Sequence, residues 1–168
     1  MALWTGMPPY DPQTSRLLLQ RSWWKDRLQG LPAEPEAPLV TPRPDLSSDE
    51  RTVVEFQIRA HDGARLWGLY ARPSASSGPV STRIRNCGPA DLPEIDESTL
   101  RHDQAEFVMQ EPAGRRLADR VLDVINLYQV AKNTPGIDRT EVSLGADNDG
   151  TFPDEFLIVR QLSDWNMC

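Results

Sequence analysis

The chain has 168 residues and a formal net charge of −7 at pH 7, with 18 Lys and Arg against 25 Asp and Glu. This length suits one ordinary domain, or one small domain with a tail. The acidic balance argues against binding DNA, RNA or an anionic membrane surface through a basic face. The two cysteines and two histidines are too few for a disulfide framework or for most zinc sites.

The sequence carries no pattern typical of a membrane or secreted protein. No stretch approaches the ~18 apolar residues that a membrane-spanning helix needs. Residues 1–10 lack the basic start and the apolar run of a secretion signal. We therefore expect a cytoplasmic protein with no membrane contact, and no motif in the chain calls for a cofactor.

The first fifty residues differ in composition from the rest. Leu17, Arg21, Trp24 and Leu28 fall at helical spacing, and Gly30 would end that helix. Five prolines between residues 32 and 44 favour extended, polyproline-like chain, because proline removes a backbone donor and fixes φ. The composition predicts a helical arm at 1–30, a proline-rich linker at 31–48 and a folded body at 49–168.

The arm contains a pair of adjacent tryptophans, Trp23 and Trp24. Two interpretations follow from them. The arm can pack back on its own domain, or the two indoles can stay exposed and anchor a dimer or another protein, since tryptophan is enriched at interface centres.

The body opens with a β-hairpin. Val54, Phe56 and Ile58 alternate with polar residues, which is typical of a strand with one buried face. Asp62-Gly63 supplies the positive φ that a tight reversal needs. A second strand over residues 65–72 then ends at Pro73.

The sequence after this hairpin predicts three further strands and two helices. Arg83 and Arg85 dilute the apolar character of the first of these strands. The last helix is capped by Thr151, although residues 156–159 would also suit a strand. A strand, a long buried helix and another strand imply a crossover, so the fold class is α/β with a parallel or mixed sheet. The predicted strands lie at 80–87, 105–109 and 141–144, and the helices at 115–133 and from 153 onward.

The order of these elements and two short phrases resemble the α/β-hydrolase superfamily, particularly its acetyl xylan esterase-like and dienelactone hydrolase-like members. Pro135-Gly136-Ile137-Asp138 resembles a phrase that precedes the nucleophile strand there, and the glycines of residues 145–150 resemble the G-x-S-x-G nucleophile turn. The resemblance covers 49–168 and implies the N-terminal half of that fold. This half of the fold is implied to contain a hairpin, a mixed sheet and a long crossover helix, and the resemblance puts Asp147 at the nucleophile position.

Two departures from that family weaken the case for catalysis. The superfamily places its catalytic histidine after the nucleophile, whereas His61 and His102 both precede Asp147. Pro89 also stands where a glycine-rich loop would donate oxyanion hydrogen bonds, and proline has no N–H. We expect a diverged or truncated hydrolase-like domain without turnover of its own.

Two alternatives remain open. One is an active carboxylic-ester hydrolase that attacks a small ester with Asp147. The other is an acidic interaction module that dimerises or binds a protein partner, because half a sheet would leave an unpaired edge strand. On this basis we expect a homo-oligomer.

The other chemistry-bearing residues have simpler interpretations. Asp147-Asn148-Asp149-Gly150 resembles part of a calcium loop, but Phe156 occupies the position of its last carboxylate, so no metal site is predicted. Cys87 could pair with His102 as a nucleophile, yet a buried, inert thiol is the simpler reading. Arg115 is expected to pair with Glu111 or Asp119.

The acidic residues of the C-terminal segment are predicted to form a solvated surface or, alternatively, a weak patch for a cation or a basic partner. They are Glu141, Asp147, Asp149, Asp154, Glu155 and Asp164.

Overall fold

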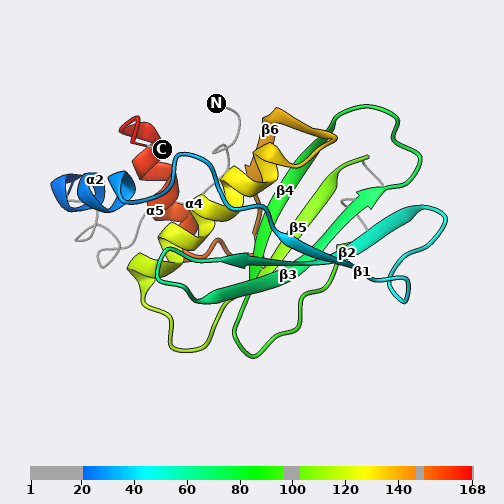
Figure 1. The fold of residues 1–168 in the computed structure, drawn as a ribbon, viewed down its shortest axis with the longest axis horizontal. Coiled ribbons are helices and arrows are strands. Elements are labelled where there is room, and N and C mark those ends of the chain that lie inside the picture. Colours follow the sequence, from blue (N-terminus) through cyan, green and yellow to red (C-terminus); the bar gives the residue numbers. More distant parts are fainter. Residues whose placement is uncertain (1–20, 97–102, 147–149, 168) are drawn as a thin grey trace.

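A computed structural model describes residues 21–96, 103–146 and 150–167. One mixed sheet holds six strands in the order β1-β2-β3-β5-β4-β6 (Figure 1), so the predicted α/β class is confirmed. The strands are β1 (Leu39–Pro42), β2 (Arg51–Arg59), β3 (Arg65–Pro73), β4 (Val80–Cys87), β5 (Ala105–Gln110) and β6 (Ile137–Leu144). The helices are α2 (Arg21–Gln29), α4 (Leu117–Asn133) and α5 (Asp154–Asp164).

The predicted hairpin is formed by β2 and β3. The two strands pair antiparallel along their whole length, from Arg51 opposite Pro73 to Arg59 opposite Arg65. Gly63 has a φ of +85°, which the Asp-Gly turn requires and which residues with a Cβ avoid. The hairpin thus follows from local sequence alone.

The direction of the strands defines two ends of the sheet. β4 runs parallel to both β5 and β6, so the last residues of these three strands lie together at the carboxyl end of the sheet. β3 runs antiparallel to β5 and places Trp67 opposite Gln110. The β2–β3 turn therefore also lies at the carboxyl end, and the start of β6 lies at the opposite, amino end.

Two strands differ from the prediction. β6 begins at Ile137 rather than at residue 141, because Gly136 with a φ of +81° turns the chain directly from α4 into the sheet. β1 was not predicted: it lies within the proline-rich segment and pairs antiparallel with β2. Pro38 and Pro42 flank its three β-forming residues, and an edge strand tolerates proline because one side of it needs no partner.

The helical boundaries agree closely with the prediction. α4 begins two residues later than expected, at Leu117, and ends at Asn133. α5 settles the alternative for residues 156–159 in favour of a helix. Its N-cap is Pro153 instead of Thr151. No helix in the described residues combines the length and the apolar character needed to cross a membrane.

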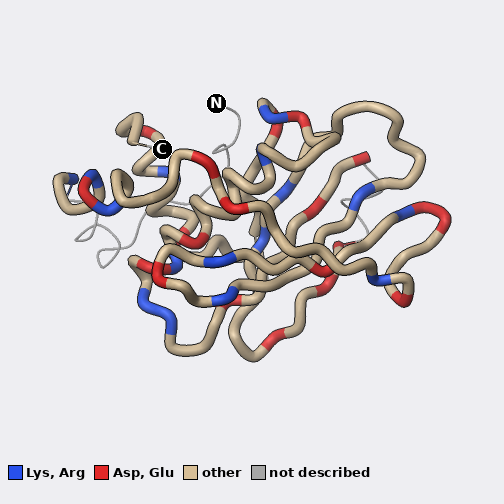
Figure 2. Tube along the Cα trace, viewed as in Figure 1, with Lys and Arg blue, Asp and Glu red and all other residues tan. Residues whose placement is uncertain are grey.

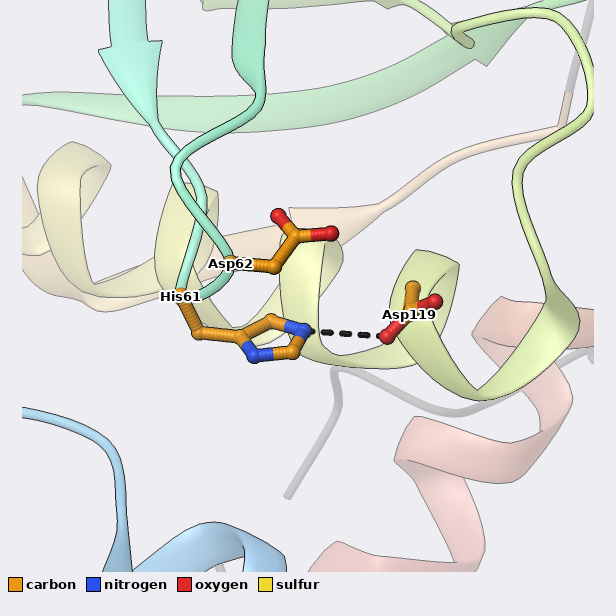
Figure 3. A group of neighbouring side chains, drawn as sticks. All are labelled: His61, Asp62 and Asp119. Atoms are coloured by element: carbon orange, nitrogen blue, oxygen red, sulfur yellow. Dashed lines mark hydrogen bonds and ion pairs between the residues drawn. The ribbon is translucent and has the colours of Figure 1, made fainter.

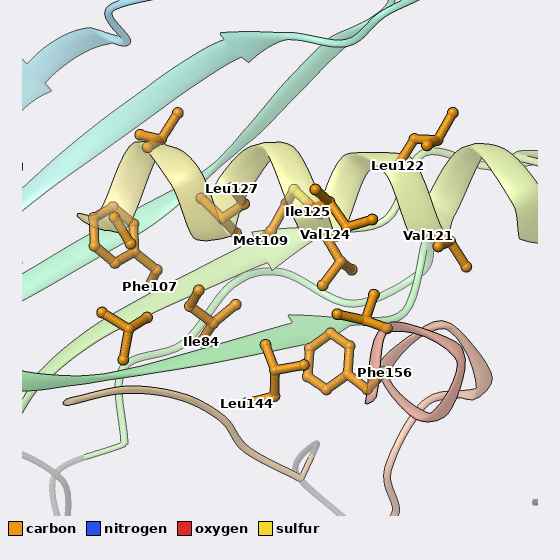
Figure 4. Packing of buried hydrophobic residues seen from close by; sticks show 14 of the residues in the cluster. Ile84, Phe107, Met109, Val121, Leu122, Val124, Ile125, Leu127, Leu144 and Phe156 are labelled. Atoms are coloured by element: carbon orange, nitrogen blue, oxygen red, sulfur yellow. The ribbon is translucent and has the colours of Figure 1, made fainter. Parts of the chain in front are cut away.

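α4 and α5 cover one face of the sheet and form the main core with it (Figure 4). Ile84, Phe107 and Met109 point from the strands toward α4, and Phe156 packs beneath from α5. Burying such side chains contributes roughly 1.5–3 kcal/mol each. The helices are therefore held by their shared apolar face.

α2, the part of the N-terminal arm that the structure describes, packs against this same core. Trp24 is 0% exposed and belongs to the core cluster, so the interpretation that both tryptophans are exposed interface anchors is wrong. Trp23 meets Trp24 edge to face at 4.7 Å, and the Arg27 guanidinium lies 3.4 Å from the centre of the Trp23 ring. The Arg21 guanidinium lies 4.6 Å from the centre of the Trp165 ring, and this cation–π contact joins α2 to the end of α5.

The opposite face of the sheet carries buried charges. Arg83 and Arg85 project there and both bond to the carboxylate of Glu106, at 2.8 Å in the case of Arg83. Asp96 accepts from Arg83 at 2.7 Å, and its backbone N–H donates to Glu106. The arginines that diluted the strand pattern are therefore paired within the sheet. Along the rest of the trace, basic and acidic residues are interspersed (Figure 2).

Candidate active site at the carboxyl end of the sheet

The carboxyl end of the sheet is where an open α/β fold usually binds its ligands. Here it gathers the ends of β4, β5 and β6, the β2–β3 turn and the first turns of α4 and α5. Asp147, the predicted nucleophile position, follows β6 and lies outside the described residues, as does His102.

Gly145 and Gly150 lie on either side of residues 147–149, and each is at a position that favours glycine. The Gly145 N–H donates to the Ile84 carbonyl at 2.8 Å, and a Cβ on Gly145 would lie only 2.6 Å from Arg83 Cδ. Gly150 has a φ of +85°. Both positions favour glycine for a physical reason, a close approach of the Arg83 side chain at Gly145 and a positive φ at Gly150.

His61, the histidine that the structure describes, is held by a carboxylate. Its Nε2 lies 3.0 Å from Asp119 Oδ1 at the start of α4 (Figure 3). His61 sits on the β2–β3 turn, whereas β6 is the third strand beyond β3 in the sheet order. Three strand spacings amount to about 14 Å. The structure thus gives His61 a partner other than the β6 turn.

Arg115 joins the same turn to α4. Its guanidinium binds Asp123 through two hydrogen bonds of 2.8 Å and also binds both oxygens of Asp62. The prediction that Arg115 pairs with Glu111 or Asp119 is wrong, because the hairpin turn and the second turn of α4 lie nearer. Arg115 holds the pKa of Asp62 down at about 2, while burial raises the pKa of Asp123.

Three side chains at this turn could in principle share a cation. His61, Asp62 and Asp119 each offer one ligand atom within 4.8 Å of the others (Figure 3). Arg115, however, occupies both oxygens of Asp62. Two remaining ligands are fewer than the three or four that protein sites give zinc, so the donor set does not fit a metal.

A second polar cluster links β4 to the two helices. Asn86 Nδ2 donates to Glu155 Oε1 at 3.0 Å, and Arg120 Nη1 donates to Glu111 Oε1 at 2.8 Å. Arg120 Nε lies 3.7 Å from Glu155 Oε2. In the described part of the chain, Arg120 Nε and Asn86 Oδ1 are buried without a hydrogen-bond partner. The described residues therefore satisfy only part of the hydrogen-bonding capacity of this cluster.

Glu155 corrects the prediction of a solvated acidic segment. It is 2% exposed, and burial raises the pKa of its carboxyl group. Its place in the first turn of α5 is favourable for a carboxylate because the helix dipole is positive there. The sequence signal was weak: an acid directly before the apolar run 156–159, following a proline.

Cys87 has the properties of an unreactive thiol. It is buried, and burial raises its pKa to about 11. Its Sγ lies 3.8 Å from the Asp91 carbonyl oxygen. Since the thiolate is the nucleophile, a thiol with this pKa is inert near pH 7, as the simpler interpretation expected.

The chain was compared with protein-family models, curated protein sequences and solved structures. Neither a protein-family model nor a curated protein sequence matches the chain. Solved structures do match. An acetyl xylan esterase from Paenibacillus sp. R4 has a TM-score of 0.56 at 12% identity, and the match covers 86% of this chain and 56% of that one. Acetyl xylan esterase 1 from Thermoanaerobacterium sp. JW/SL YS485 has a TM-score of 0.59 at 15% identity, and that match covers 87% of this chain and 54% of the esterase.

A third structure agrees with these two. A Bacteroides fragilis protein described as an acetyl xylan esterase has a TM-score of 0.64 at 10% identity, covering 91% of this chain and 52% of that one. The chain thus spans about half the length of the esterases it matches. It contains the hairpin of β2 and β3, the crossover helix α4 and the strand β6, as the resemblance implied. The chain therefore has the α/β-hydrolase fold, over the half that these elements make up.

Proposed function

We propose that this chain is an α/β-hydrolase-fold domain that does not turn over esters on its own. The observation that carries the proposal is the position of His61, which is paired with Asp119 on the β2–β3 turn. Hydrolysis of an ester intermediate needs a general base within about 3 Å of the attacking water. His61 is separated from β6 by two intervening strands, and this separation supports the proposal that His61 does not act as the base for Asp147.

The polar groups nearer that turn support the same proposal. The Glu155 carboxylate is buried against Asn86 and Arg120. Cys87, at the end of β4, has a raised pKa and is a poor nucleophile. These groups connect β4, α4 and α5 to one another, which is a structural task.

The test is an esterase assay on the 168-residue chain with para-nitrophenyl acetate, a small activated ester. The hydrolysis rate is compared with that of buffer for the wild type and for three variants: Asp147→Asn, Glu155→Gln and the control Asp138→Asn. Asp138 is half-buried at the start of β6, which lies at the amino end of the sheet, away from the end of β6 that Asp147 follows. We expect all four to match the buffer rate. Hydrolysis that Asp147→Asn abolishes and Asp138→Asn retains would support the active-esterase alternative instead.

A second candidate function is protein interaction through a sheet edge. In the described residues, β6 pairs with β4 alone and β1 pairs with β2 alone, so both outer strands have an open side. Leu39 on β1 is 72% exposed. Open strands of this kind readily recruit another chain. This observation favours a homo-oligomer or a protein partner over a solitary domain.

A further inference from the structure

A cavity at the amino end of the sheet lies well away from the candidate site. It has a volume of about 710 Å³, within the range that small-molecule sites occupy. Its floor is formed by β2, β3, β5 and the end of α4, and the segment 34–38 covers it on the way to β1. Figure 1 shows this segment crossing over α4 between α2 and β1. The proline-rich segment therefore forms one wall of the cavity, opposite the sheet and the end of α4.

The walls of the cavity are mainly apolar and aromatic. Tyr70 stacks on Phe107 with ring centres 4.3 Å apart and an angle of 22° between the planes. Phe56 meets the same Phe107 ring edge to face at 5.5 Å. Val54 and Val130 complete the floor. Such a surface favours a ligand with an apolar body, since burying it releases water from both partners.

Two polar groups on β3 face this apolar surface. The Tyr70 hydroxyl is buried and has no hydrogen-bond partner in the described residues. Burial raises the pKa of this phenol, against the opposing effect of the Arg72 charge, so it remains a donor at neutral pH. A buried donor without an acceptor is destabilising, and a ligand oxygen would supply the missing acceptor.

Arg72 is the second polar group. It donates to the carbonyl oxygens of Pro135 at 3.4 Å and Gly78 at 3.1 Å. Both acceptors are neutral, and within residues 21–96, 103–146 and 150–167 no carboxylate forms an ion pair with it. Tyr70 and Arg72 are two residues apart on one strand, so they project to the same face of the sheet. Together they offer a neutral donor and an uncompensated positive charge.

The covering segment adds the opposite charge. Glu34 and Glu36 line the cavity from above, and Glu36 lies 4.0 Å from Arg59. These carboxylates repel an anion from the cover and leave the Arg72 side as the favourable place for it. A ligand would therefore lie with its charged end toward β3.

We propose that this cavity binds an apolar monocarboxylate, with its carboxylate on Arg72 and Tyr70 and its body against Phe107 and Phe56. The site is independent of ester turnover, because it lies at the opposite end of the sheet from the Asp147 turn.

The experiment is isothermal titration calorimetry of the whole chain with octanoate at pH 7, compared with 1-octanol and octylamine, which share its apolar body. We expect saturable 1:1 binding of octanoate and weaker binding of the alcohol and the amine. Octylamine binding as tightly as octanoate, or the absence of saturable octanoate binding, would overturn the proposal.

Four variants locate the site. Ala37→Trp fills the cavity from its exposed cover, and Ala33→Trp adds the same side chain to the same segment outside the cavity lining. We expect Ala37→Trp to abolish binding and Ala33→Trp to retain it. Arg72→Gln should weaken octanoate binding roughly 10- to 100-fold, and Arg72→Lys should restore part of it. Equal affinity in both tryptophan variants would contradict the proposed location, with circular dichroism confirming that each variant is folded.

Discussion

Arg83 and Glu106 stand opposite each other on the parallel strands β4 and β5, and their side chains form an ion pair of 2.8 Å. The Glu106 side chain is 0% exposed, and Arg85 contacts the same carboxylate oxygen. A buried carboxylate is tolerable only when charged partners and hydrogen bonds replace the water it has lost. The Glu106 carboxylate on β5 therefore stabilises the pairing of β5 with β4 through two arginines of β4.

Replacing Glu106 should destabilise the fold strongly. In Glu106→Gln the buried Arg85 loses its charged partner, whereas the half-buried Arg83 keeps Asp96; breaking a buried pair in this way typically costs about 3–5 kcal/mol. Urea unfolding followed by circular dichroism measures the change. The control is Asp45→Asn, which breaks an exposed, solvent-screened pair with Arg43 and should leave stability nearly unchanged. Similar losses in both variants would contradict the structural role of Glu106.

Removing Trp24 tests whether the arm is part of the folded core. Trp24→Ala deletes a completely buried indole, and such truncations cost about 3–5 kcal/mol because they leave a cavity. Leu39→Ala, at an exposed position on β1, serves as the control and should change stability by less than about 0.5 kcal/mol. A Trp24→Ala protein as stable as wild type would show that the arm is not needed for folding.

The contact of Asp62 with Arg115 predicts a pH dependence of stability. The pKa of Asp62 is about 2 in the fold and near 3.8 without it, so the contribution is complete above about pH 4 and disappears as the pH falls to 2. The side chain is 39% exposed, and screening limits the effect to about 1 kcal/mol.

Unfolding of wild type and Asp62→Asn between pH 2 and 7 measures this contribution directly. Wild type should be the more stable protein at pH 7, and the difference should vanish near pH 2. The raised pKa of Asp123 acts in the opposite direction, and its main cause, burial, is common to both proteins. A difference that stays constant with pH would rule out the linkage.

The open side of β1 predicts self-association. We expect light scattering coupled to size-exclusion chromatography to show a dimer or larger assembly at high concentration. Leu39→Lys should shift it to the monomer, because a lysine on an exposed edge strand opposes pairing with another strand. A wild-type monomer at all concentrations would remove the basis for this interaction.

The sequence alone determined the local elements. The Asp62-Gly63 turn, the alternation from Val54 to Ile58 and the apolar stripe of α4 are short-range patterns, and each appears in the structure close to its predicted limits. Their order along the chain also indicated the α/β class, because strand and helix order constrains topology. The hydrolase fold was indicated by a resemblance that used this order together with two short phrases, at 135–138 and 145–150.

Tertiary contacts decided the features that depend on distant residues. β1 forms because β2 offers it a partner, and Trp24 is buried because α2 finds the core. Glu155, Arg115 and Glu106 look like surface charges in sequence, yet their partners lie on other elements, at Asn86, Asp123 and Arg83. A charge is buried only where the fold supplies its counter-charge, and no local pattern records which residue that is.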